Sequence, residues 1–308
     1  MASKRAWSIR AFVAGTDNAG VSKLLLQVAT FDGGVDALSS TMLAARLAHP
    51  SAMNGAAWRI AESSSSTIIG ALLVFFIGTK RTELVVAVNP AFRRQGIGRA
   101  LLDTAPRDRR LLCTSRESVG GASALLEAAG FSERHRHLRM RREATAVSLL
   151  DVDGAEIVDD FKKDARRAIV VLTAAIGEDV DDDRGWMKAR LARERCAVLY
   201  LAAKSETGEV VDAGICIVAP SECAKKGERT ASGEPIVGVI SDVGLMRSMR
   251  GRGLSRALVR AGMKRAEQLG FRFVEVAADK RRVAAVELYE REGFEVADED
   301  ISWMRKEA

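Results

Sequence analysis

Apolar and polar positions in the first half of the chain follow short strand-like and helix-like repeats in turn. Residues 7–13 alternate with a period of two, as a half-buried strand does, while the apolar positions of residues 17–29 recur at helical spacing. A second helix is expected over residues 35–48, because Pro50 disfavours its continuation. Further strands are expected at 57–62, 67–76, 83–88, 110–114 and 131–142, and further helices at 97–104 and 122–129.

The second half repeats this mixture of strands and helices. A brief strand at 147–150 is expected to precede a helix over 155–174 and another that begins with the acidic triplet 181–183 and runs to residue 191. Acidic residues at a helix start complement its dipole, which favours a helix cap over a metal site. The polar stretch 220–235 is expected to be a mobile insert, either a surface loop or a substrate lid. Later strands are expected at 196–203, 210–218, 236–246, 271–277 and 294–304, and later helices at 254–269 and 283–291.

A glycine-rich basic turn, M-R-G-R-G-L-S-R-A-L at 249–258, separates a predicted strand from a predicted helix. Small residues let backbone N–H groups approach an anion, and the positive end of the helix points at the same place. This arrangement suits a pyrophosphate, although a plain tight turn fits the same residues. A second copy lies half a chain length earlier, which indicates duplication. Arg93, Gly96 and Gly98 there match Arg250, Gly253 and Ser255.

Length and composition describe an ordinary globular protein of two domains. The chain has 308 residues, of which 47% are hydrophobic and 29% charged. The apolar run at 68–77 is too short to span a bilayer, and the N-terminus lacks the apolar core of a signal peptide. The four cysteines have no C-x-x-C spacing, so we expect reduced thiols and no metal site. A cytoplasmic protein without a membrane partner is therefore expected.

The net charge of +6 raises the question of nucleic-acid binding. The basic residues are scattered, and aromatic residues make up 5% of the chain, which leaves few platforms for stacking bases. The densest basic stretch, 134–142, is expected to be a solvated strand face that guards a sheet edge. Nucleic acid is therefore not the expected partner.

A second motif follows each glycine turn. The string L-Y-E-R-E-G-F at 288–294 has a weaker echo, L-L-E-A-A-G-F, at 125–131. Together the turns and these strings resemble the GNAT superfamily of acyl-CoA-dependent N-acyltransferases, whose signature is V-x-P-x-x-R-x-x-G-x-G/A followed by Y-x-x-x-G-F. The resemblance covers both halves of the chain. It implies a mixed α/β fold with two tandem GNAT-like domains, 1–144 and 145–308, each a mostly antiparallel sheet with one parallel βα cofactor-binding unit.

The resemblance also implies the cofactor, acetyl-CoA or another acyl-CoA. Backbone amides of the turn would hold its pyrophosphate, and the strand before the turn would pair with its pantetheine arm. The expected cofactor-binding residues of the second half are Val243, Gly244, Leu245, Met246, Arg250, Gly251, Arg252, Gly253, Leu254, Ser255 and Arg256. Those of the first half are Val88, Arg93, Arg94, Gln95, Gly96, Ile97, Gly98 and Arg99.

Two residues of the second half are candidates for catalysis. Tyr289 matches the family's tyrosine that protonates the departing thiolate, although an ordinary half-buried aromatic fits the same position. The family often has an asparagine seven residues earlier, where this chain has Arg282. No histidine falls at a plausible catalytic position. Asp242 is therefore the first candidate for the general base, with a structural role as the alternative and Asp212 in reserve.

The first half lacks both candidates, having Leu126 where the second half has Tyr289 and Val85 where it has Asp242. We expect the first half to be degenerate: able to bind acyl-CoA, yet catalytically weak or purely structural.

The expected function is transfer of an acetyl group from acetyl-CoA to a primary amine of a small molecule, performed by the C-terminal half. The duplication and the R-G-R-G-L stretch are also similar to mycothiol synthase, a tandem GNAT that acetylates a cysteinyl amine. An antibiotic amine fits the pattern equally well. A non-catalytic acyl-CoA sensor or scaffold is the alternative from another class, and a monomer or a homodimer fits either function.

Overall fold

The structure is a computed structural model that describes residues 6–33, 35–36, 38–77, 81–152, 154–176, 184–205 and 207–306. Strands and helices succeed one another in two similar series. The first comprises β1 (Trp7–Ala11), α1 (Asn18–Asp32), α2 (Ser40–Ala48), η1 (Pro50–Gly55), β2 (Arg59–Ser63), β3 (Ile68–Ile77), β4 (Arg81–Val88), η2 (Pro90–Phe92), α3 (Ile97–Asp103), β5 (Arg110–Arg116), α4 (Ala122–Ala128) and β6 (Ser132–Glu143). The second comprises β7 (Ala155–Asp159), α5 (Ala165–Ile176), α6 (Arg184–Leu191), β8 (Ala197–Lys204), β9 (Val210–Pro220), η3 (Lys226–Glu228), β10 (Val237–Leu245), η4 (Arg247–Met249), α7 (Leu254–Gln268), β11 (Phe273–Asp279), α8 (Val283–Arg291) and β12 (Glu295–Arg305).

These elements form two compact units, and each unit takes its last strand from the other half of the sequence. Unit 1 contains the described residues of Met1–His137, Glu222–Gly227 and Asp298–Ala308. Unit 2 contains those of Leu138–Ser221 and Glu228–Ala297. The division expected at residues 144 and 145 therefore concerns the two sequence halves and stays a proposal for the two functional domains.

The sheet of unit 1 has the order β1-β2-β3-β4-β5-β12. Neighbouring strands are antiparallel except β4 and β5, which run parallel. Strand β12 pairs antiparallel with β5, with Asp300 opposite Arg116 and Trp303 opposite Cys113. The core of the unit is centred on Trp58, whose ring packs between Phe12 and Phe75 and whose Nε1 donates a hydrogen bond to the carbonyl of Val74.

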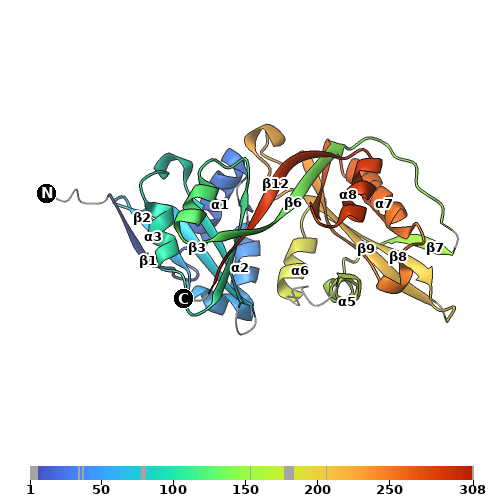
Figure 1. The fold of residues 1–308 in the computed structure, drawn as a ribbon, viewed down its shortest axis with the longest axis horizontal. Coiled ribbons are helices and arrows are strands. Elements are labelled where there is room, and N and C mark those ends of the chain that lie inside the picture. Colours follow the sequence, from blue (N-terminus) through green and yellow to red (C-terminus); the bar gives the residue numbers. More distant parts are fainter. Residues whose placement is uncertain are drawn as a thin grey trace. The chain divides into compact units, whose positions relative to one another are not determined.

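The sheet of unit 2 has the order β6-β11-β10-β9-β8-β7, in which β10 and β11 run parallel. Residues of β8 and β9 alternate between its two faces. Leu199, Leu201 and Cys216 pack with α7 and α8, while Val198 and Ile217 pack with α5 and α6 on the other face. Figure 1 shows these two helix pairs on opposite sides of β8 and β9. The expected mixed α/β architecture, mostly antiparallel with one parallel pair in each half, is confirmed.

The sequence interpretation was wrong at the start of the second half. No strand occurs at 147–150, and the expected helix 155–174 is divided into β7 and a helix that starts at Ala165. Residues of β7 alternate, so Ala155 and Ile157 pack on the core while Glu156 is exposed. Asp160 then accepts hydrogen bonds from the backbone N–H groups of Lys162 and Asp164, which turns the chain into α5. The acidic triplet 181–183 lies outside the described residues.

Two charged segments also differ from expectation. The basic stretch 134–142 guards no edge, because β6 lies inside the strand order, and Arg139 and Arg141 pair with the buried carboxylate of Glu275 at 2.5 Å each. The insert 220–235 is structured. It contains η3, a short ladder between Arg229 and Pro235, and an ion pair of 2.6 Å from Glu228 to Arg141.

The four cysteines are free thiols, as expected. Among the described helices, none has the length and apolar character needed to cross a bilayer.

Candidate active site

The parallel strands of unit 2 separate where the candidate residues lie. Strand β10 pairs with β11 from Val237 to Ile240 and with β9 along its whole length. A register shift between Ile240 and Asp242 marks a bulge. Beyond this bulge the backbone of β10 no longer pairs with β11. An extended ligand can therefore add to β10 here as a further strand would.

The glycine turn follows directly and presents a concave row of N–H groups. Gly251 and Gly253 adopt left-handed φ angles of 79° and 77°, and no other atom occupies the space where a Cβ would lie. Gly253 caps α7 without a side-chain hydrogen bond. None of the backbone N–H groups of residues 251–255 donates to another described residue. Alternating left-handed residues at a helix start form an anion-binding nest.

The arginine side chains of this turn are largely engaged by the protein itself. Arg250 donates to the carbonyls of Leu245, at 3.4 Å, and Ala175, at 3.0 Å. Arg256 pairs at 2.5 Å with Glu292, a buried carboxylate that Arg260 also contacts at 2.7 Å. The anion-binding capacity of the turn therefore rests on its backbone more than on these two side chains. Sequence reasoning missed the role of Glu292, because nothing local marks its partners Arg256 and Arg260.

Tyr289 lies on α8 and is 6% exposed. Its ring makes an edge-to-face contact with Phe294 at 5.8 Å, within the cluster that α7 and α8 form on the sheet. Burial raises the pKa of Tyr289 to about 12, so the phenol keeps its proton at neutral pH. A protonated phenol at this place can donate a proton to a basic group and cannot accept one.

Asp242 lies on the opposite face of the same sheet. Gly244, two residues later, points toward α5, where an added Cβ would lie 3.0 Å from Ala175 Cβ. The Asp242 carboxylate accepts a hydrogen bond of 2.5 Å from Arg190 of α6, and Arg190 also donates to Ser241 Oγ. Asp212, the reserve candidate, forms a bidentate ion pair with Arg167, whose Nε and Nη2 each donate to one carboxylate oxygen. The ion-pair partners Arg190 and Arg167 escaped the sequence analysis, because neither belongs to a motif.

Unit 1 repeats the backbone of this site. Pairing between β4 and β5 stops at Leu84 and Cys113, although β4 continues to Val88. Arg94 and Gly96 adopt left-handed φ angles of 63° and 80°, in the places of the two glycines of the other turn. The N–H groups of residues 94–98 likewise donate to no described residue.

The arginine at the start of this turn behaves like its counterpart Arg250. Arg93 donates to the carbonyl of Val88 at 3.2 Å, five residues back, and forms a 2.5 Å ion pair with Asp32 of α1. Arg93 and Arg250 thus each donate a hydrogen bond to the carbonyl of the last residue of the preceding strand, β4 or β10.

A cavity of about 530 Å³ occupies the gap between β4 and β5 in unit 1. Its walls are mainly apolar, and the glycine turn forms part of its rim. Leu126 lines it at the position equivalent to Tyr289, and Cys113 lines it from β5. Burial raises the pKa of Cys113 to about 12, so this thiol is neutral and unreactive at neutral pH. The carboxylate in its lining, Asp32, is held in the ion pair with Arg93, so the cavity offers a binding site in which neither Leu126 nor Cys113 supplies an acid or a base.

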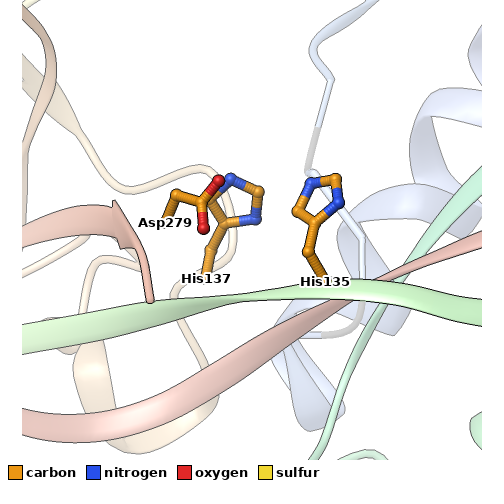
Figure 2. Close-up of side chains that lie close together, drawn as sticks. All are labelled: His135, His137 and Asp279. Carbon is orange, nitrogen blue, oxygen red and sulfur yellow. The ribbon is translucent and has the colours of Figure 1, made fainter. Parts of the chain in front are cut away.

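No histidine lines this cavity. His135 and His137 project from one side of β6 (Figure 2), with ring centroids 5.0 Å apart. Asp279, the last residue of β11, forms an ion pair of 2.6 Å with Arg281.

Comparison with known protein families accounts for both repeats. The model of the acetyltransferase (GNAT) family matches residues 164–294, and that of the acetyltransferase (GNAT) domain matches residues 54–135. Together the two matches cover more than half of the chain. The chain belongs to the GNAT superfamily. It is an acyl-CoA-dependent N-acyltransferase with two tandem GNAT domains, as the glycine turns had indicated.

Similar proteins align with this chain over most of their length. The mycothiol acetyltransferase of Corynebacterium glutamicum strain R is 27% identical over 298 residues, which are 90% of each chain. That of Geodermatophilus obscurus is 29% identical over 235 residues, covering 74% of this chain and 75% of the relative. Among solved structures, a tandem GNAT protein from the clavulanic acid biosynthesis pathway aligns with a TM-score of 0.72 at 19% identity, over 98% of this chain and 99% of that one. A GCN5-related N-acetyltransferase from Sphaerobacter thermophilus aligns with a TM-score of 0.67 at 19% identity, over 98% and 96%.

Proposed function

We propose that the C-terminal half transfers an acetyl group from acetyl-CoA to the primary amine of a small molecule. The observation that carries this proposal is the placement of Asp242 and Tyr289 on opposite faces of the sheet where β10 leaves β11. An acyl group bound where this pairing ends would have a carboxylate toward one face of the sheet and a protonated phenol toward the other. The amine would approach on the Asp242 side.

Each of the proposed groups has one role, in binding acetyl-CoA or in transferring a proton. N–H groups of residues 251–255 hold the pyrophosphate, and unpaired backbone of β10 orients the pantetheine arm. The amine nitrogen bonds to the acetyl carbon, the carbon–sulfur bond breaks, and the sulfur leaves as a thiolate. Asp242 accepts the proton that the amine loses, and Tyr289 donates a proton to the sulfur. The products are the amide and free CoA.

Arg190 gives Asp242 a defined position. Its guanidinium contacts one carboxylate oxygen, Oδ2, at 2.5 Å. A carboxylate fixed on one oxygen can still turn the other toward an ammonium group. Arg190 is therefore a positioning residue in this proposal.

A cysteinyl amine is the more specific substrate candidate. A relative named mycothiol acetyltransferase matches 90% of this chain at 27% identity, which supports a related amine. Other small primary amines remain the broader proposal. The free thiols agree with action in the reducing cytoplasm.

The N-terminal half is proposed to bind acyl-CoA without turning it over. Its cavity and its row of N–H groups supply the binding elements, and Leu126 and Val85 replace the acid and the base. A binding site without catalysis would make unit 1 structural or regulatory.

Gly253→Trp and Gly96→Trp test these assignments separately, because bulk on either turn obstructs the pyrophosphate. Calorimetry should find two acetyl-CoA sites in the wild-type protein and one in each variant. Amine-dependent release of CoA thiol should fall more than a hundredfold in Gly253→Trp and persist in Gly96→Trp. Gly270→Trp is the matched control, because Gly270 closes the same helix with φ 74° and open space around it. Turnover lost only in Gly96→Trp would reverse the assignment, and no binding to the wild-type chain would refute it.

A further inference from the structure

Unit 1 includes two segments from the second half of the sequence, and both lie beside its cavity. One is Glu222–Gly227, from the insert between β9 and β10, and the other is the end of β12 from Asp298 onward. Neither is needed to build the glycine turn of unit 1. We therefore ask whether a ligand bound in the cavity changes the position of either segment.

The first segment packs on the end of α1 so closely that no side chain fits at Gly33. At Gly33 an added Cβ would lie 2.6 Å from the backbone oxygen of Cys223 and 3.4 Å from Lys225 Cε. The thiol of Cys223 donates to the carboxylate of Asp36 at 2.8 Å. Glycine is required at position 33 both for its φ of 69° and for this close approach. The docked segment is thus held by a backbone contact and a polar contact.

Arg116 joins the cavity to both segments. It is 6% exposed and lines the cavity from the end of β5. The same guanidinium would meet a Cβ at Gly33, beside Cys223. Its Nε lies 3.5 Å from Asp300 and 3.9 Å from Asp298 of β12. A ligand that contacts Arg116 therefore contacts a residue that pairs with β12 and lies beside the contact of Gly33 with Cys223.

Each segment is covalently continuous with a part of the proposed C-terminal site. Residues 222–227 lie between β9 and β10, and β10 carries Asp242. The loop is closed at its base by a backbone hydrogen bond from Ser221 to Val237 of 2.9 Å. Strand β12 follows α8, which carries Tyr289, after a turn of three residues. Movement of either segment would thus pull on an element that bears a catalytic group.

We propose that the N-terminal cavity is a regulatory acyl-CoA site whose occupation favours the docked form of Glu222–Gly227 and thereby sets the activity of the C-terminal site. This inference rests on the proposed function of both halves. The two states are the segment docked on Gly33 and the segment released from it. Asp32 and Arg116, which line the cavity, flank the docking contact, so a ligand that orders them favours docking. Linkage requires the converse, that docking strengthens ligand binding.

Cys223 reports the docked state chemically. It is half-buried, whereas Cys113, Cys196 and Cys216 are buried. Labelling by iodoacetamide, located by mass spectrometry, measures how often the Cys223 thiol leaves Asp36. Saturating acetyl-CoA should slow this labelling at least fivefold in the wild-type protein and in Gly253→Trp, where the N-terminal site alone remains.

Gly33→Ala disturbs the docking contact together with Arg116, whereas Asp36→Asn changes the docking contact and no residue that lines the cavity. Gly33→Ala should speed Cys223 labelling at least fivefold, remove the protection by acetyl-CoA, and lower kcat of the C-terminal site about fivefold. Gly15→Ala is the matched control, since Gly15 has φ 84° and no atom near its missing Cβ. Asp36→Asn, which keeps the shape and removes the charge of the acceptor, should weaken docking in the same direction with little strain.

The outcomes distinguish this proposal from the one on which it rests. Calorimetric binding of acetyl-CoA to Gly253→Trp with unchanged Cys223 labelling would overturn the regulatory link and leave the binding site standing. No binding to Gly253→Trp would overturn both. Normal kcat in Gly33→Ala and Asp36→Asn, with Cys223 labelled rapidly in each, would show that docking does not reach the C-terminal site and would also overturn the link.

Discussion

The two glycine turns of this protein have nearly the same backbone and very different surroundings. In each, two left-handed residues alternate, five successive N–H groups are unpaired within the described structure, and an arginine braces the carbonyl of the strand end. The first turn leads into a cavity lined by Leu126. The second follows the strand that carries an ion-paired carboxylate, Asp242, and the half that contains it has a buried phenol, Tyr289, where the first half has Leu126.

This contrast separates what binding requires from what chemistry requires. Anion binding by backbone N–H groups depends on conformation, which two small or left-handed positions can maintain through many other substitutions. Proton transfer depends on a particular side chain at a particular place, and one substitution removes it. A duplicated domain can therefore lose catalysis while its binding site stays intact.

Removal of the proposed base is expected to have the largest effect. Asp242→Asn keeps the shape of the side chain and its hydrogen bond from Arg190, yet it cannot accept a proton at neutral pH. We expect kcat/KM for the amine to fall about a hundredfold, with the acetyl-CoA Kd little changed. Val85→Thr, at the equivalent position of the first half, is the control and should keep full turnover. Turnover of Asp242→Asn within threefold of wild type would assign Asp242 a structural role and direct attention to Asp212.

Loss of the proposed acid should have a smaller effect. Tyr289→Phe keeps the ring contact with Phe294 and should lower kcat about tenfold, the modest end of general acid–base catalysis. Leu126→Met, the conservative change in the other half, should leave kcat as it is. An unchanged kcat in Tyr289→Phe, or a loss in Leu126→Met, would contradict the assignment of the active half.

The pH dependence of stability offers a second measure of Tyr289. Its pKa is raised to about 12 in the folded chain, above the ordinary tyrosine value of about 10. The folded state therefore holds this proton more tightly. Its contribution is complete below about pH 10 and is lost as the pH rises toward 12, by up to about 3 kcal/mol. Chemical denaturation at pH 8 and pH 11 should show a smaller alkaline loss in Tyr289→Phe than in wild type. An equal loss in both would mean that the phenol is not desolvated.

The sequence was most informative where function depends on local backbone conformation. Both turns were recognisable because small residues and an arginine recur at the same spacing. The exchange of β6 and β12 between units was not, because pairing is decided by partners more than 150 positions away. The partners of Asp242 and Arg256, which lie 52 and 36 positions away, belong to no motif that pairs them and could not be foreseen either. Helix periodicity failed at 155–159, where five alternating residues form an edge strand instead.

The bracing arginines allow a test of whether their side chains also bind cofactor. Arg250→Gln removes the bonds to Leu245 and Ala175, and Arg93→Gln removes those to Val88 and Asp32. Each change should cost about 2 kcal/mol in unfolding free energy, as hydrogen bonds from charged donors do. The acetyl-CoA Kd should rise less than threefold. A tenfold weaker Kd with a reduced dependence on salt would show instead that the guanidinium reaches a phosphate.

The smallest expected effect concerns the one position at which the two turns differ in backbone cost. Arg94 adopts a left-handed φ of 63°, whereas its counterpart Gly251 occupies that region without a Cβ penalty. Arg94→Gly should therefore raise the unfolding free energy by about 1 kcal/mol, and Gly251→Arg should lower it by a similar amount. Gln95→Gly is the control: Gln95 has an ordinary φ, so glycine there only adds freedom to the unfolded chain and should destabilise slightly.

Arg94→Gly should change acetyl-CoA binding and protein stability in opposite directions. Arg94 lines the cavity of unit 1, so removing its charge should weaken acetyl-CoA there severalfold even as the fold gains stability. A strained residue that improves binding is the pattern expected when a site is maintained for its ligand. If Arg94→Gly left the affinity of the N-terminal site unchanged and stabilised the chain, the arginine would have no function in binding. The backbone N–H groups of the turn would then account for binding without this side chain.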